Sequence, residues 1–134
     1  MMIRRKSRSD MRRMDRRIEG DNRRSDTPPD LNVTAQIKDK NLLLWLDNVL
    51  TAGNSFVLRD TVERALAGNN DVNRIIINME KTTYVDTGGI SLLMEFHKRF
   101  AAANKAFILF RVTPRVKQIL DILNMDKVFN IRDH

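Results

Sequence analysis

Short apolar runs rich in β-branched residues alternate with amphipathic helical segments along most of this chain. The runs at 74–79 (RIIINM) and 106–110 (AFILF) are strand-sized, and the segment after each one repeats apolar residues at helical spacing. Strands that alternate with helices require right-handed crossovers, which place the strands parallel in one sheet. The pattern therefore predicts an α/β domain, with the strand at 74–79 covered on both faces.

The remaining elements follow from the same periodicities. Two apolar runs, at 32–38 and 41–46, are joined by a polar turn and predict an antiparallel hairpin at the start of the domain. Helical spacing predicts three helices, at about 58–66, 87–103 and 113–124, and a short apolar run predicts a last strand at 127–131. The predicted order is therefore β-β-α-β-α-β-α-β, a mixed and largely parallel sheet with helices packed on it.

The first thirty residues differ in composition from the rest. Met1–Asp30 hold ten Lys/Arg and six Asp/Glu, a net +4 of the chain's +7, and few large apolar residues. We expect a basic, mostly disordered tail, followed by one domain over 31–134. Met11, Met14 and Ile18 fit one face of a short basic helix, which leaves open a contact with nucleic acid or an anionic membrane. A solvated tail is favoured, because six acids dilute the basic run.

Composition excludes several classes of function. The chain has no cysteine, so disulfides, thiolate catalysis and cysteine-ligated metals are ruled out. Its only histidines are His97 and His134, which makes a metal site or a histidine base a poor hypothesis, and we expect His97 to pack at the edge of its helix. The longest apolar run, 42–46, is far shorter than a membrane span, and we expect a cytoplasmic protein without metal or cofactor.

The stretch at 84–93 (YVDTGGISLL) places Asp86, Thr87, Gly88 and Gly89 where a strand gives way to a helix. This is the carboxyl edge of the sheet, where functional sites of such folds lie. The stretch lacks the lysine of a phosphate loop, the spacing of a dinucleotide fingerprint and the serine of a hydrolase elbow. Two interpretations stay open: Thr87 caps the helix, which physics alone favours, or its hydroxyl is a regulatory phosphorylation site. The glycines are expected to leave the first turn bare, so that another protein can approach.

From Leu31 to Asp133 the sequence resembles the STAS domain, and in particular the single-domain anti-sigma factor antagonists of bacterial partner-switching systems. Two stretches carry the resemblance, 74–96 (RIIINMEKTTYVDTGGISLLMEF) and 104–131 (NKAFILFRVTPRVKQILDILNMDKVFNI), in the family's order and spacing. They include its Asp-Ser/Thr-x-Gly motif at the start of a helix. The resemblance implies a mixed sheet with helices packed on it, in agreement with the order predicted above.

The resemblance also implies a function. In that family a partner kinase, which is also the anti-sigma factor, phosphorylates the Ser/Thr of the motif, and a PP2C-type phosphatase resets it. Thr87 is then the acceptor, and the domain is a binding module rather than an enzyme, with no cofactor and no small-molecule substrate. The implied partner-binding residues are the helix start and the loop after the second strand: Asp86, Thr87, Gly88, Gly89, Ser91, Thr51 and Asn54.

Three departures from the family pattern keep a second function open. Threonine as the acceptor is commoner in scaffold-type relatives, and Gly88 stands where Ser or Thr is frequent. The loop after the second strand lacks the usual Gly-Glu-Leu-Asp, with Thr51 about where the Asp belongs. The threonine and the missing acidic loop fit about as well a STAS accessory subunit that docks on the ATPase of a lipid-transport ABC transporter and needs no phosphorylation. The carboxyl-terminal segment at 112–129 matches the anti-sigma factor antagonists and favours that function.

Overall fold

A computed structural model describes residues 31–133, and the predicted tail at 1–30 lies outside the described residues, as does His134. The elements follow one another in the predicted order. They are β1 (Leu31–Lys38), β2 (Asn41–Leu50), α1 (Ser55–Leu66), β3 (Arg74–Val85), α2 (Thr87–Ala102), β4 (Ala106–Phe110), α3 (Pro114–Ile122) and β5 (Asn130–Arg132).

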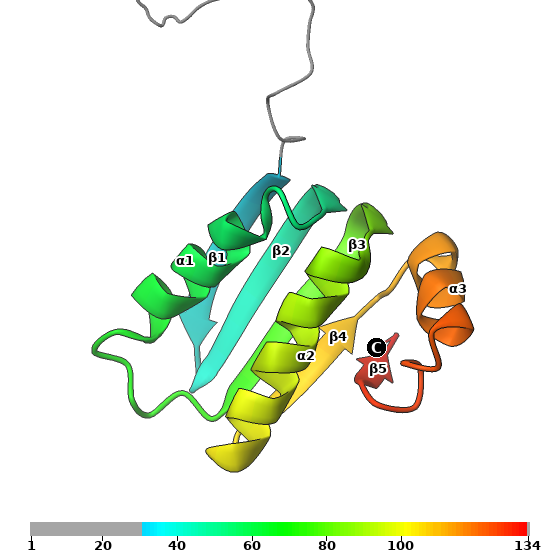
Figure 1. Ribbon diagram of the computed structural model, residues 1–134. Helices are drawn as coiled ribbons and strands as arrows, with labels where there is room; N and C mark the ends of the chain where they lie inside the picture. The colour runs from blue at the N-terminus through cyan, green and yellow to red at the C-terminus, as the bar shows by residue number, and fades with distance from the viewer. Residues whose placement is uncertain (1–30, 134) are drawn as a thin grey trace, which may run out of the picture.

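The five strands form one mixed sheet in the order β1-β2-β3-β4-β5 (Figure 1). β1 pairs antiparallel with β2, while β2 to β5 run parallel to one another. Leu43, Ile76 and Ile108 lie in one row across the centre of the sheet. The predicted α/β class and the predicted hairpin are therefore confirmed.

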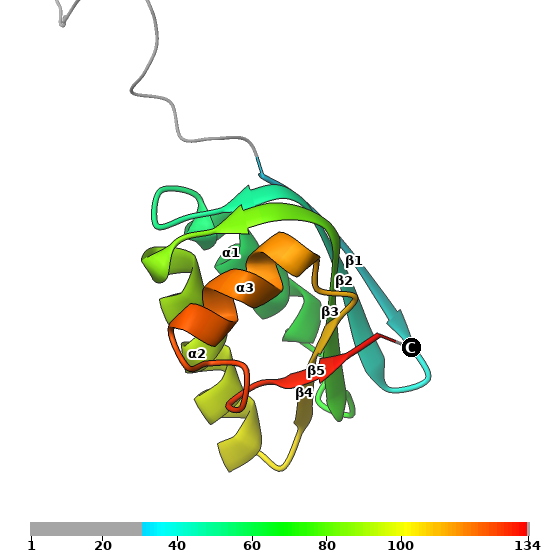
Figure 2. The same ribbon diagram turned by 90° about the vertical axis from the view of Figure 1, so that its right-hand side faces the viewer.

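All three helices lie on one face of the sheet, as Figure 2 shows. Each parallel strand joins the next in the same direction across the sheet, and right-handed crossovers then return every helix to the same side. Ile75 and Ile77 of β3 are buried on that side, but Ile76 and Asn78 on the other side are only half-buried. The prediction that this strand is covered on both faces is wrong.

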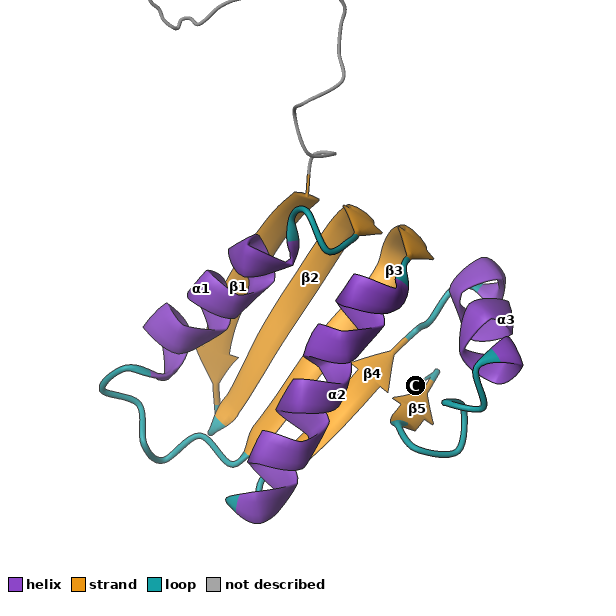
Figure 3. Ribbon diagram, in the orientation of Figure 1, coloured by secondary structure: helices purple, strands orange, loops and turns teal. Residues whose placement is uncertain are grey.

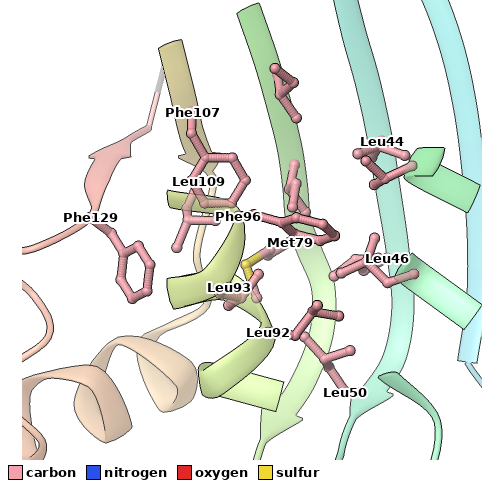
Figure 4. Packing of buried hydrophobic residues seen from close by; sticks show 14 of the residues in the cluster. Leu44, Leu46, Leu50, Met79, Leu92, Leu93, Phe96, Phe107, Leu109 and Phe129 are labelled. Carbon is pink, nitrogen blue, oxygen red and sulfur yellow. The ribbon is translucent and has the colours of Figure 1, made fainter. Parts of the chain in front are cut away.

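The core lies between the sheet and the helices (Figure 4). Phe96 and Phe100 of α2 stack with ring centroids 5.7 Å apart, and Phe107 of β4 lies 6.2 and 5.9 Å from them. Burying each such side chain contributes about 1.5–3 kcal/mol. Leu58 and Val62 of α1 are buried against the same core, as their spacing predicts. This packing fixes α1 and α2 on the sheet and so positions the site at their first turns.

The carboxyl-terminal elements are shorter than predicted. α3 ends at Ile122, because Asn124 adopts a left-handed conformation (φ 58°), and Leu123 just after the helix is exposed. The last strand begins only at Asn130, since the amide of Phe129 turns back to the carbonyl of Met125 at 3.3 Å. Phe129 is nevertheless buried, which explains why an apolar run at 127–131 looked like a strand.

The ring of His97 meets the ring of Phe129 edge-on, with centroids 5.8 Å apart. His97 is half-buried there, so the predicted packing role is confirmed. Among residues 31–133, no helix has the length and apolar character needed to cross a membrane.

Candidate functional site at the start of α2

β2 and β3 end side by side at the carboxyl edge of the sheet, and each is followed by a helix (Figure 3). Leu50 is paired with Val85 at these ends, and the amide of Asp86 donates to the carbonyl of Leu50 at 3.1 Å. The loop between β2 and α1 therefore lies directly beside the first turn of α2. Residues far apart in the sequence meet here, as the resemblance implied.

Asp86 caps α2. Its Oδ1 accepts a hydrogen bond from the amide of Gly89 at 2.8 Å, and the same carboxylate accepts from the amide of Ala52 at 3.1 and 3.3 Å. One side chain thus satisfies a helix amide and ties the neighbouring loop to the helix start. The interpretation of Thr87 as the cap is wrong, because the extended backbone of Asp86 puts Asp86 at the N-cap and Thr87 one residue inside the helix.

Thr87 is the first residue of α2, and it is exposed. Within the part of the chain that the structure describes, its hydroxyl forms no hydrogen bond, and only its carbonyl is used, accepting from the Ser91 hydroxyl at 2.9 Å. Folding therefore does not use this hydroxyl. It is open to solvent.

The two glycines face the chain's own loop. A Cβ on Gly88 would lie 2.3 Å from the Cβ of Ala52, and one on Gly89 would lie 2.6 Å from the carbonyl oxygen of Leu50. Gly89 is buried and Gly88 half-buried. The expectation that they leave the first turn bare for another protein is wrong: the loop after β2 already covers it, and the glycines are needed for that close approach.

Asn54 and Thr51 shape this loop from the inside. Asn54 is only 2 % exposed; its Oδ1 accepts from the Thr51 amide at 2.8 Å, and its Nδ2 donates to the Val49 carbonyl at 3.0 Å. The Thr51 Oγ1 is buried as well, without a hydrogen-bond partner among the residues described. Both predicted contact residues thus lie at the site, but they hold the loop rather than project from it.

Exposed residues of the loop and of α1 surround Thr87. Ala52 and Gly53 are exposed at the tip of the loop, and Phe56 in the first turn of α1 is 57 % exposed. Phe56 was not identified as a site residue from the sequence. A signal was present, because Phe56 lies outside the apolar spacing of Leu58 and Val62 and therefore had no predicted place in the core. An exposed phenylalanine beside the site is a suitable anchor for a protein partner.

α1 and α2 run side by side and begin at the same edge. Ion pairs join Arg59 to Glu95 and Arg99 to Glu63, the latter at 2.6 Å. The hydrogen bond from Arg59 holds the pKa of Glu95 below its usual value. Exposed pairs of this kind contribute at most about 1 kcal/mol, so their main effect is alignment of the helices.

The alignment places the exposed residues on one surface. Phe56 precedes Arg59 by three residues on the side of α1 that faces α2, while Ser91 precedes Glu95 by four on the matching side of α2. We call the resulting patch the helix-start surface. It comprises Ala52, Gly53, Phe56, Thr87 and Ser91. Residues 31–133 contain no group of three or more His, Asp or Glu side chains able to hold a metal.

The family model of the STAS domain matches residues 32–134. The chain belongs to the STAS domain family. Solved structures share the fold of this STAS domain at low identity. A candidate anti-sigma factor antagonist from Thermotoga maritima is 18 % identical over 76 % of this chain and 86 % of that chain, with a TM-score of 0.69.

Two further structures show the same fold. An anti-sigma factor antagonist from Mycobacterium paratuberculosis is 10 % identical over 78 % of this chain and 87 % of that chain, with a TM-score of 0.68. The Bacillus cell fate determinant SpoIIAA, in its phosphorylated form, is 15 % identical over 78 % of this chain and 92 % of that chain, with a TM-score of 0.58. At these identities the comparisons establish the fold of the STAS domain.

Proposed function

We propose that this STAS domain is an anti-sigma factor antagonist whose partner is a protein kinase that also acts as the anti-sigma factor. The domain binds this kinase through the helix-start surface and is released when Thr87 is phosphorylated. The observation that carries the proposal is the exposed hydroxyl of Thr87, left unused because Asp86 supplies the cap. The proposal places the protein in the cytoplasm, as a binding module and not an enzyme.

The electrostatics at the start of α2 suit a reversible phosphate. None of the three helices has an acidic residue in its first turn, and all three begin at the carboxyl edge of the sheet. Their positive dipole ends tolerate an anion there, so a phosphate on Thr87 leaves the fold intact. The neighbouring Asp86 carboxylate already occupies the nearest amides, so the phosphate projects outward.

The phosphate acts on the partner rather than on the fold. It adds about −1.5 to −2 charges to a surface whose other members, Ala52, Gly53, Phe56 and Ser91, are uncharged. A partner shaped to cover Phe56 and a neutral hydroxyl must then bury a charge without a counterion. Binding weakens by roughly a hundredfold, and a PP2C-type phosphatase restores it.

The test begins with the kinase. The chain is used as bait in a lysate of its native organism, the retained kinase is identified by mass spectrometry, and the purified pair is incubated with ATP. We expect one phosphate on Thr87, absent from Thr87→Ala. The matched control is Ser91→Ala, which removes the exposed hydroxyl one turn away and is expected to keep full labelling. Labelling of Ser91 instead, or no labelling of Thr87, contradicts the proposal.

A second candidate function is that of an accessory subunit on the ATPase of a lipid-transport ABC transporter. The observation that favours it is the uncharged loop after β2, where residues 51–55 carry no carboxylate for an anti-sigma factor to recognise. In that case the retained protein is a transporter ATPase, and it binds through the helix-start surface without ATP-dependent release. Thr87→Ala and the wild type then bind it equally, with or without ATP.

A further inference from the structure

The face of the sheet opposite the helices is apolar at its centre. Leu43, Trp45, Ile76 and Phe110 line a shallow groove of about 290 Å³ there, together with the polar Asn78. The strand register places these side chains in adjacent rows on three strands. We call this surface, from β1 to β5, the open face. Its Trp45 is the only tryptophan of the chain.

Cations border the open face. Asp47 and Glu80 are its carboxylates, and Glu80 is already paired with Arg111 at 3.0 Å. The strand register places four exposed cations around the groove, none in an ion pair with another residue of 31–133: Lys38, Arg74, Lys81 and Arg132. An occupant with an apolar centre and acidic borders therefore matches this surface in both polarity and charge.

We propose that residues Asp10–Glu19 of this same chain occupy the open face. On a helical projection of 100° per residue, Met11, Met14 and Ile18 form one apolar stripe. Asp10 borders the stripe on one side and Asp15 borders it on the other, with Glu19 next beyond Asp15. The arginines at 12, 13 and 16 fall on the opposite side, away from the cations of the sheet, whereas Arg17 lies on the flank of the stripe beside Asp10. The inference is independent of Thr87 and extends beyond the proposed function.

The tether makes this contact possible. Leu31 is paired with Asn48, so the chain enters β1 at the edge of the open face, about 11 Å from Trp45 by strand spacing and rise. The stretch from Glu19 to Leu31 can span up to about 40 Å, which covers any part of the face. A tethered segment of this length has an effective concentration of about millimolar, so weak contacts suffice to keep it bound.

The size of the face argues against a second copy as the occupant. Five strands and the length from Asn41 to Asp47 give the open face roughly 400 Å². A stable interface between two proteins buries about 800 Å² on each partner. An intramolecular segment needs no such area, because the loss of translational freedom on association does not arise.

Trp45 reports the contact directly in the full-length chain. The emission maximum of Trp45 and its quenching by acrylamide are compared between the wild type and Met14→Asp/Ile18→Asp. We expect the double variant to shift the emission to longer wavelength and to lose the protection from quenching. Ile3→Asp is the matched control, since it places the same change in the first thirty residues but outside the segment, and it should match the wild type.

Charge reversal tests the borders. Asp10→Arg/Asp15→Arg should expose Trp45 as the apolar variants do, and adding Lys38→Glu and Arg74→Glu should restore part of the protection. Identical Trp45 spectra in the wild type and the Met14/Ile18 variant overturn the proposal. So does protection that rises with protein concentration, which assigns the face to a second copy, and so does protection that develops only when anionic vesicles are added.

Discussion

A threonine stands at the start of both α2 and α3, after a strand of the same sheet, but the two hydroxyls have different surroundings. Thr113 is the N-cap of α3; its Oγ1 accepts from the amide of Val116 at 3.4 Å and donates to the carbonyl of Thr82 at 3.0 Å. Thr87 lies one residue inside α2, exposed and without such a bond, because Asp86 is the cap. The fold therefore uses the hydroxyl of Thr113 as a helix cap and leaves the hydroxyl of Thr87 exposed.

The loop after β2 sharpens this contrast. At the start of α2 the loop is packed onto the helix, with Ala52 against Gly88 and Leu50 against Gly89. The backbone, the two glycines and the Asp86 carboxylate therefore provide the stability of the structure at the start of α2. The Thr87 side chain adds nothing to it, so Thr87 should tolerate mutation better than Thr113, whereas Gly89 and Asp86 should not.

The largest effect is expected for Gly89→Ala. Its new Cβ would lie 2.6 Å from the backbone oxygen of Leu50, and neither strand end nor helix can move without breaking the hydrogen bond between Asp86 and Leu50. We expect a loss of about 3 kcal/mol in the free energy of unfolding, measured by urea denaturation. A variant as stable as the wild type would show that the loop is not packed against α2.

Asp86→Ala comes next. It leaves the amides of Gly89 and Ala52 without their acceptor and frees the loop from the helix. We expect a loss of about 2 kcal/mol, the upper end of the range for an N-cap. Asp86→Asn, which keeps an acceptor oxygen, is the control and should recover most of the loss. Equal losses in the two variants would assign the effect to charge rather than to the cap.

Thr113→Ala is expected to lose about 1 kcal/mol, because it removes the cap of α3 and the bond to the carbonyl of Thr82. Thr113→Ser retains the hydroxyl and should be close to the wild type in the same denaturation experiment. If Thr113→Ala were neutral, the contrast between the two helix starts would disappear.

Much of this arrangement was predictable from periodicity. The apolar runs at 74–79 and 106–110 and the spacing of Leu58 and Val62 are local signals, and they gave the right element order. That the helices cover only one face of the sheet was not predictable, since Ile76 is half-buried although it lies within the apolar run of its strand. It depends on the order of the strands, which periodicity does not contain.

The details of the site were beyond the sequence for a similar reason. Asp and Thr are both good N-caps, so the pair Asp86–Thr87 does not reveal which residue takes the role; the backbone position decides it. Likewise, the inward direction of Asn54 depends on contacts with Val49 and Thr51 that only the folded loop creates. The place of the site at the carboxyl edge, by contrast, followed from the strand–helix order alone.

The smallest effect on stability is expected for Thr87→Ala. The hydroxyl is exposed and makes no hydrogen bond to another residue of 31–133, so the free energy of unfolding should stay within about 0.5 kcal/mol of the wild type. When the free energies of unfolding of Thr87→Ala and Thr113→Ala are measured side by side, their difference gives the difference between the structural roles of the two threonines. A loss equal to that of Thr113→Ala would mean that Thr87 has a structural role.

The most direct test of the account is the affinity of the retained kinase for Thr87→Glu relative to Thr87→Ala, measured by calorimetry. Both variants should be folded and nearly as stable as the wild type, so any difference arises at the helix-start surface. We predict that Thr87→Ala binds like the unphosphorylated wild type. Thr87→Glu, with a single charge, should bind at least about tenfold more weakly, against roughly a hundredfold for the phosphate. Equal affinities of the two variants would contradict the account.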